Sequence, residues 1–274
     1  MSMLACDTHH HILDPERFPY PPSAGKGLPA ATVEDYRLIM ARLGLKRNVI
    51  VTPSIYGTDN ACTLDALRQM GDSARAVVVL AEKEVTDDQL KAMHEAGVRG
   101  VRYFVPGDDL EDPEEISAMA RRIAPIGWHL DFWMKADLIV RYKDLLEDLP
   151  CPMVFDHRGH LPADLGIRHP AYGIILSLMK ERRAWVKISA LYHDTACRQT
   201  GYQDTIEVSR AYVREAPDQV IWGTDWPHPS ELTSPYGIPD DAELLDALLS
   251  QASGDTGLVR HILEDNPARL YGWI

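Results

Sequence analysis

The sequence predicts an α/β fold, a (β/α)8 TIM barrel that forms a single domain over residues 1–274. Three observations favour this fold. Short apolar runs recur along the whole chain, and most are β-branched and aliphatic on both faces, as is typical of parallel strands buried on both sides. Segments with helical periodicity or capping signals lie between these runs. The first run leads into histidines and not into the glycine-rich phosphate turn of an open doubly wound sheet, so a closed barrel is expected.

Eight strands are expected, each bounded by turn residues. They cover 4–8, 48–52, 76–80, 98–105, 128–133, 153–156, 185–189 and 220–224. Helices are expected over 32–43, 113–124, 136–149, 171–182, 202–214, 240–249 and 258–263. A further helix begins at a capping box formed by Thr86 and Gln89 and ends at Gly97. The stretch 15–29 is rich in proline and glycine, and we interpret it as a long loop that covers one end of the barrel.

The net charge of the chain is −13. Because so acidic a surface repels nucleic-acid phosphates and anionic lipid headgroups, we expect neither a nucleic acid nor a membrane as a partner. The amino terminus lacks the basic and apolar regions of a signal peptide, and no stretch is apolar enough to span a bilayer. The four cysteines lie far apart without a Cys-x-x-Cys pair, which is typical of reduced thiols. We therefore expect a cytoplasmic protein, and the sequence leaves open whether it forms a homo-oligomer.

Polar residues follow the expected strands at the carboxyl ends, where barrel enzymes place their active sites. His9 and His11 are two residues apart on one strand, so they face the same way while His10 points elsewhere. His157 follows the sixth strand and Asp225 follows the eighth. A single buried histidine or aspartate is more often structural than catalytic, but the joint appearance of four such residues at three strand ends favours a functional site.

Several short segments match the amidohydrolase superfamily in their residues and in their order along the chain, so the chain resembles that superfamily. Within it, the chain is similar to the branch of 2-pyrone-4,6-dicarboxylate lactonase and related lactone hydrolases and isomerases. The two most specific segments are Asp156-His157-Arg158-Gly159 and Gly223-Thr224-Asp225-Trp226-Pro227-His228. The other matching segments cover 7–11, 18–20, 57–60, 97–102, 127–129 and 266–271. The resemblance extends over nearly the whole chain and implies an amidohydrolase-like barrel.

The resemblance implies a catalytic mechanism for opening a lactone, which is a cyclic ester. Asp225 would take a proton from water and direct the nucleophile to the lactone carbonyl. His9, His11 and His157 would polarise that carbonyl as negative charge develops on its oxygen. Asp225 would then return the proton to the leaving ring oxygen.

The same residues bear on whether the protein needs a metal. Three imidazoles and a carboxylate could hold one divalent ion such as zinc, with His9, His11, His157 and Asp225 as its ligands. The expected fifth strand has no histidine at its carboxyl end, and His129 lies at its other end, so a binuclear site is incomplete. Members of the lactonase branch work without metal. We therefore expect either no required cofactor or one optional divalent metal.

The resemblance also names residues that would bind the substrate, a small-molecule lactone. They are Ser54, Arg102, Trp133, Tyr192, His193 and His228, with Arg102 taking an acid group. Asp108 and His193 stand where the dicarboxylate enzymes carry further arginines, and neither replaces an arginine fork. We therefore expect a lactone with one anionic group, such as the muconolactone-type intermediates of aromatic compound degradation, or a sugar-acid lactone, ahead of a pyrone dicarboxylate. Arg158 and His160 are expected as lid contacts, and Arg99 as a structural residue.

Three other functions are compatible with these residues. In a sugar-acid lactone isomerase, a substrate hydroxyl would replace water as the nucleophile at Asp225. A decarboxylase of the same superfamily would need tightly bound zinc. A catalytically silent barrel that only binds a ligand is disfavoured, because both the strand-8 aspartate and the His-x-His pair are present.

Overall fold

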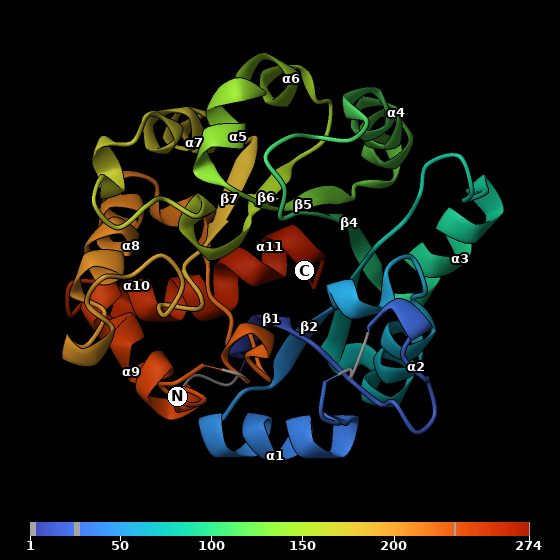
Figure 1. Ribbon diagram of the computed structural model, residues 1–274, viewed down its shortest axis with the longest axis horizontal. Helices are drawn as coiled ribbons and strands as arrows, with labels where there is room; N and C mark the ends of the chain where they lie inside the picture. The colour runs from blue at the N-terminus through green and yellow to red at the C-terminus, as the bar shows by residue number, and fades with distance from the viewer. Residues whose placement is uncertain (1–3, 25–27, 233, 274) are drawn as a thin grey trace.

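Eight parallel strands, each hydrogen-bonded to the next in chain order, form the centre of the computed structural model, and helices surround them (Figure 1). The structure describes residues 4–24, 28–232 and 234–273. The strands are β1 Cys6–His10, β2 Arg47–Val51, β3 Ala74–Val78, β4 Val98–Val105, β5 His129–Met134, β6 Met153–Phe155, β7 Ala184–Lys187 and β8 Val220–Ile221. The expected (β/α)8 barrel is therefore confirmed.

The barrel closes where β8 and the segment after it meet β1. The amide of Thr8 donates to Trp222 O (3.0 Å), and the amide of Asp225 donates to His9 O (2.8 Å). A parallel bridge also joins His10 to Trp226. The first strand is thus joined to the segment that follows the last strand and carries Asp225. Residues from the two ends of the chain therefore lie together at the carboxyl ends of the strands.

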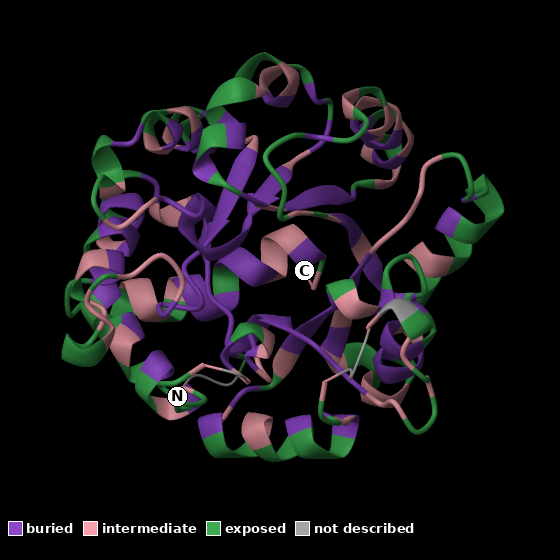
Figure 2. Ribbon diagram, in the orientation of Figure 1, coloured by how far each residue is buried: buried purple, intermediate pink, exposed green. Residues whose placement is uncertain are grey.

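Helices cover the outside of the ring and bury their inner faces against it, as the purple strands and the green outer helix faces of Figure 2 show. The helices are α1 Val33–Leu43, α2 Ala61–Met70, α3 Asp87–Ala96, α4 Pro113–Ile123, α5 Ala136–Arg141, α6 Lys143–Asp148, α7 Pro170–Lys180, α8 Gln203–Glu215, α9 Asp241–Gln251, α10 Thr256–Arg260 and α11 Asn266–Tyr271. Short 3₁₀ turns and a π-helical turn, His261–Asp265, connect several of them.

Most predicted elements occur within a few residues of their predicted bounds. The capping box at Thr86 is present, and Gly97 ends that helix in the left-handed conformation. Two predictions were wrong in detail, and one helix was missed. The expected helix 136–149 is two helices that break at Tyr142, and the expected helix 258–263 ends at Arg260 and continues as a π-helical turn. The helix α2 was not predicted.

The amino-terminal end of the barrel is closed by α11, which lies across the centre of the ring in Figure 1. Tyr271 on this helix is fully buried and belongs to a cluster of inward-facing residues that includes Cys6, Val49 and Ile221. The Nε atom of Arg75, near the start of β3, donates to Tyr271 O (3.2 Å). The barrel interior is thus packed at its amino-terminal end, which leaves the carboxyl ends of the strands as the place where barrel enzymes bind their ligands.

The loop expected over 15–29 is described except at residues 25–27. It is fixed where an antiparallel bridge pairs Leu13 with Ala31. Leu28 lines a cavity at the carboxyl ends of the strands, so this loop does reach the end of the barrel that the sequence predicts for the site. Among the described residues, no helix is both long and apolar enough to cross a membrane.

Candidate active site

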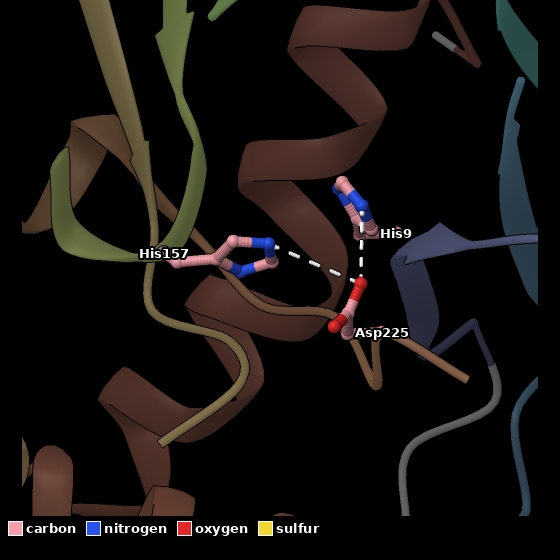
Figure 3. A group of neighbouring side chains, drawn as sticks. All are labelled: His9, His157 and Asp225. Carbon is pink, nitrogen blue, oxygen red and sulfur yellow. Dashed lines mark ion pairs between the residues drawn. The ribbon is translucent and has the colours of Figure 1, made fainter. Parts of the chain in front are cut away.

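Three imidazoles surround the Asp225 carboxylate at the carboxyl ends of β1, β6 and β8. The Oδ1 atom of Asp225 lies 3.4 Å from His9 Nε2, 3.5 Å from His11 Nε2 and 3.9 Å from His157 Nε2. Figure 3 shows His9 and His157 pointing toward Asp225 from two different strands. All four residues are buried. The structure therefore brings together the catalytic residues that the sequence predicts, whereas His10 faces away and bonds Asn48 (3.0 Å).

The backbone around these side chains is tightly constrained. A Cβ atom on Gly223 would meet His9 N at 2.6 Å, so only glycine lets β8 approach β1 this closely. Asp225 and His157 both adopt left-handed backbone conformations, with φ of 64° and 46°. Such conformations cost non-glycine residues on the order of 1–3 kcal/mol each, and they cluster at functional sites.

The site holds an ionised carboxylate beside the neutral imidazoles of His9 and His157. Burial alone would raise the pKa of Asp225, but the neighbouring His157 and His9 hold it well below its usual range. Burial lowers the pKa of His9 to about 3 and that of His157 well below its usual value. At neutral pH the carboxylate is therefore ready to accept a proton, which a general base requires.

Each imidazole is held by a second partner on its Nδ1 atom. His11 Nδ1 lies 2.7 Å from the carbonyl oxygen of Val51, which can only accept, so neutral His11 carries its hydrogen on Nδ1 and a lone pair on Nε2. His157 Nδ1 shares a hydrogen bond with Ser189 Oγ (2.9 Å). His9 Nδ1 lies 2.9 Å from the ammonium of Lys187. These contacts fix the ring orientations.

The residues fit one divalent metal ion at this position. Ligand atoms of His9, His157 and Asp225 all lie within 4.8 Å of one another, and three imidazoles with one carboxylate form a typical zinc-binding set. The buried Nε2 atom of His9 also has no hydrogen-bond partner among the described residues. A second set, His9 with Asp131 and Asp156, has the same spacing, but the ammonium of Lys187 contacts all three of its members. The residues therefore do not fit a second ion.

A cavity of about 280 Å³ opens beside the imidazoles. Its lining includes His11, Ser54, Arg102, Trp133, His157, His193 and Asp225, all predicted as site residues. A larger cavity of about 730 Å³ adjoins it, because Ser54, Arg102 and Phe104 line both. The guanidinium of Arg102 donates to Thr52 O (3.1 Å) and lies 3.6 Å from Asp156 Oδ2. Its Nε atom has no partner among the described residues, so the group retains capacity to bind an anion.

Tyr192 and His228 occupy positions that differ from the prediction. Both are buried, and neither is among the described residues that line the 280 Å³ cavity. The Tyr192 hydroxyl donates to Asp225 Oδ2 (2.6 Å) and lies 2.9 Å from His228 Nδ1. His228 Nε2 in turn lies 3.1 Å from Asp241 Oδ1. Tyr192 and His228 thus hold the Asp225 carboxylate in place without lining the cavity. Their geometry does not support the prediction that they contact the substrate.

The expected lid contacts also differ. Arg158 is buried and donates to the carbonyl oxygens of Ala190 and His193 (3.1 Å each), so it clamps the loop after β7 and is not a lid residue. His160 pairs with Asp194 (2.9 Å), and its ring lies 4.4 Å from that of Trp133. Arg99 donates to Val98 O and His94 O, consistent with a structural role.

Three buried charged residues below the imidazoles were not given roles by the sequence reasoning. They are Asp131 on β5, Asp156 after β6 and Lys187 on β7. A signal was present, since Asp131 and Lys187 each interrupt an otherwise apolar strand at a position that alternation directs into the barrel. A charged residue at such a position is almost never buried without a partner.

The chain is similar over nearly its whole length to several known proteins. The chain is 34% identical over 273 residues to 4-sulfomuconolactone hydrolase from Hydrogenophaga intermedia, covering 98% of this chain and 88% of that protein. It is 32% identical to 2-pyrone-4,6-dicarboxylate hydrolase from Comamonas testosteroni (97% and 90% covered) and 29% identical to D-galactarolactone isomerase from Agrobacterium fabrum strain C58 (97% and 90% covered).

A solved apo structure from Agrobacterium tumefaciens superposes on the fold with a TM-score of 0.84 and 28% identity, over 97% of this chain and 95% of that one. The amidohydrolase family model matches residues 6–273, which include every residue of the site described above. On this match and on the full-length similarity to its members, the chain belongs to the amidohydrolase family.

Proposed function

We propose that the protein is a hydrolase that opens a lactone carrying one acid group or sugar-acid hydroxyls. The observation that carries the proposal is the buried, ionised carboxylate of Asp225, with three imidazole nitrogens 3.4, 3.5 and 3.9 Å from one of its oxygens. Relatives with the same fold are named as lactone hydrolases, which supports this substrate class.

In the proposed reaction, Asp225 removes a proton from water while the water oxygen bonds to the lactone carbonyl carbon. His11 Nε2, with its lone pair, and Asp225 Oδ1 are both acceptors 3.5 Å apart, so one water beside the pair can donate a hydrogen to each and keep its own lone pair for attack. His9 and His157 stabilise the negative charge that develops on the carbonyl oxygen. The ring C–O bond then breaks, and Asp225 returns its proton to the leaving oxygen.

When bound, a single divalent ion held by His9, His11, His157 and Asp225 would polarise the carbonyl and acidify the water, and its binding would release any hydrogen that His9 carries on Nε2. The residues described above supply a general base and orienting groups by themselves. We therefore propose that such a metal is optional.

Arg102 is the group proposed to bind the acid function of the substrate. It is buried and reaches both cavities. Among the charged residues that line the larger cavity, acidic groups outnumber the two cations Arg102 and Lys83; the acidic residues are Glu82, Glu84, Asp109, Glu111, Asp112 and Glu115. Because a second carboxylate would meet this negative lining, a substrate with one acid group is favoured over a dicarboxylate.

The isomerase reading remains the second candidate, because one relative is named D-galactarolactone isomerase. In that reaction a hydroxyl of the substrate would take the place of water beside Asp225. Proton release separates the two, since hydrolysis of a lactone yields a new carboxylic acid whereas isomerisation does not.

The test is proton release across a panel of carboxylated and sugar-acid lactones, with and without a chelator. We expect wild-type turnover to persist in chelator and Asp225→Asn to lose about 10²- to 10⁴-fold in kcat. Asp65→Asn is the control, since this carboxylate on α2 pairs with Arg17 and Arg68 away from the site. No proton release from any lactone by folded protein would refute hydrolysis, and product formation without proton release would establish isomerisation.

A further inference from the structure

Lys187 is a fully buried lysine that the proposed reaction does not use. It lies on β7, below the imidazoles, and its ammonium touches groups from three other strands or strand ends. The Nζ atom donates to Asp131 Oδ2, lies 2.9 Å from His9 Nδ1 and forms an ion pair with Asp156 Oδ1 at 3.0 Å. An ammonium has only donors, so each of these contacts requires an acceptor on the other side.

This requirement determines which nitrogen of His9 carries hydrogen. If Nδ1 carried it, two donors would face each other at 2.9 Å, and a buried ammonium hydrogen would lose its acceptor. If Nδ1 instead carries a lone pair, Lys187 donates to it, and the hydrogen of neutral His9 sits on Nε2. That atom is the one that faces Asp225 Oδ1 at 3.4 Å.

Among the residues that the structure describes, Asp156 also lies close enough to compete for His9 Nδ1. Its Oδ1 atom lies 3.2 Å away, a distance that would allow a hydrogen bond. However, neither carboxylate oxygen of Asp156 has a hydrogen-bond partner among the described residues, so the direction of this contact does not suit donation from the ring. The contact from Lys187 is shorter and does have hydrogen-bond geometry.

The charges around Lys187 explain why it stays protonated. Two carboxylates contact the ammonium, since Nζ donates to Asp131 Oδ2 and lies 3.0 Å from Asp156 Oδ1. Arg102 lies 3.6 Å from Asp156 on the other side, so two cations face two carboxylates within the barrel. The ammonium thus lies among Asp131, Asp156 and His9, the set whose spacing would otherwise suit a metal ion.

We propose that Lys187 is a positioning residue that replaces a metal ion among His9, Asp131 and Asp156 and holds the hydrogen of His9 on Nε2. His9 then presents an N–H group to the oxygen that becomes negative during lactone opening. This catalytic consequence rests on the proposed function, but the position of the hydrogen and the exclusion of a second cation do not.

The first test is the nitrogen-15 NMR spectrum of the histidine rings in the full-length wild-type protein after chelation. His9 is assigned by loss of its signals in His9→Asn. We expect wild-type His9 to carry hydrogen on Nε2, and Lys187→Met to shift the hydrogen toward Nδ1, with the spectrum of His10 unchanged as the internal control. Wild-type His9 with its hydrogen on Nδ1 would overturn the proposal. This outcome is measured on the wild-type protein, and His9→Asn, used only for the assignment, is first shown to be folded by circular dichroism.

The second test is zinc content after purification in the same zinc-containing buffer. We expect Lys187→Met to hold zinc about 10- to 100-fold more tightly than wild type, because it removes the competing cation and leaves two carboxylates beside His9. Lys180→Met is the control, since Lys180 is exposed and pairs with Glu215. Equal zinc binding by wild type and by folded Lys187→Met would contradict the cation replacement, whatever the lactone assay gives.

Discussion

At the scale of single residues, the direction of each hydrogen bond determines how the side chains of the site act. His9, His11, His157 and Asp225 follow strands, and barrel topology places strand ends together, so their proximity could be inferred. Hydrogen-bond direction could not, because it depends on groups that are distant in sequence, such as Val51 O beside His11 and Lys187 beside His9.

Tyr192 leads to a prediction at this scale. Its hydroxyl donates to Asp225 Oδ2 (2.6 Å), and its ring is buried, so Tyr192→Phe removes one hydrogen bond and retains the packing. We expect kcat to fall about 10- to 100-fold with little change in KM, because the carboxylate loses its orientation. Tyr212→Phe, at another buried tyrosine, is the control. A higher KM at unchanged kcat would instead show that Tyr192 binds the substrate, as the sequence predicts.

At the scale of secondary-structure elements, hydrophobic pattern and capping signals were sufficient for the eight strands and most helices. The helix α2 was missed because it lacks a capping box: the side chain of Asn60, which precedes its first turn, makes no capping hydrogen bond. The break between α5 and α6 at Tyr142 carries neither proline nor glycine, so nothing local announced it. Where such a helix begins or breaks depends on its packing against neighbouring elements, which the local sequence does not show.

The approach of β1 to β8 gives a prediction for this scale. A methyl group at Gly223 would lie 2.7 Å from His9 Cβ and 2.6 Å from its backbone nitrogen, so Gly223→Ala must displace the strand that carries two imidazoles. We expect the free energy of unfolding to fall by about 1–3 kcal/mol and activity to fall with it. In the matched control, Gly173→Ala, the methyl group enters open space on α7, and stability should rise by about 0.5–1 kcal/mol. Chemical denaturation measures both, and equal effects would refute the argument.

At the scale of the whole molecule, buried imidazoles set the response to acid. His129 is buried without a partner for either ring nitrogen among the described residues, and burial lowers its pKa to about 3. In the unfolded chain the same ring has a pKa near its ordinary value of about 6.5. The unfolded state therefore binds more protons between these two values, and stability falls as pH decreases from about 6.5 toward 3.

Removing this ring should weaken that dependence. In His129→Leu, we expect the loss of unfolding free energy between pH 7 and pH 4 to shrink by about 1–3 kcal/mol relative to wild type. Equilibrium denaturation at several pH values measures the difference. His261→Leu serves as the control, because that half-exposed ring pairs with Asp218 and Asp265 at the surface. Parallel curves for wild type and His129→Leu would show that His129 does not contribute.

The two adjoining cavities have a consequence for how such a protein can acquire new specificities. The groups that face the reacting bond come from β1, β6 and β8, whereas the larger cavity is lined by the loops after β2, β3 and β4. Recognition and reactivity therefore occupy adjoining sectors of one ring, and among the described residues the two cavities share Ser54, Arg102 and Phe104. Exchanging the loops of one sector would retarget the scaffold while its reactive half stayed untouched, which makes the barrel a modular starting point for directed evolution.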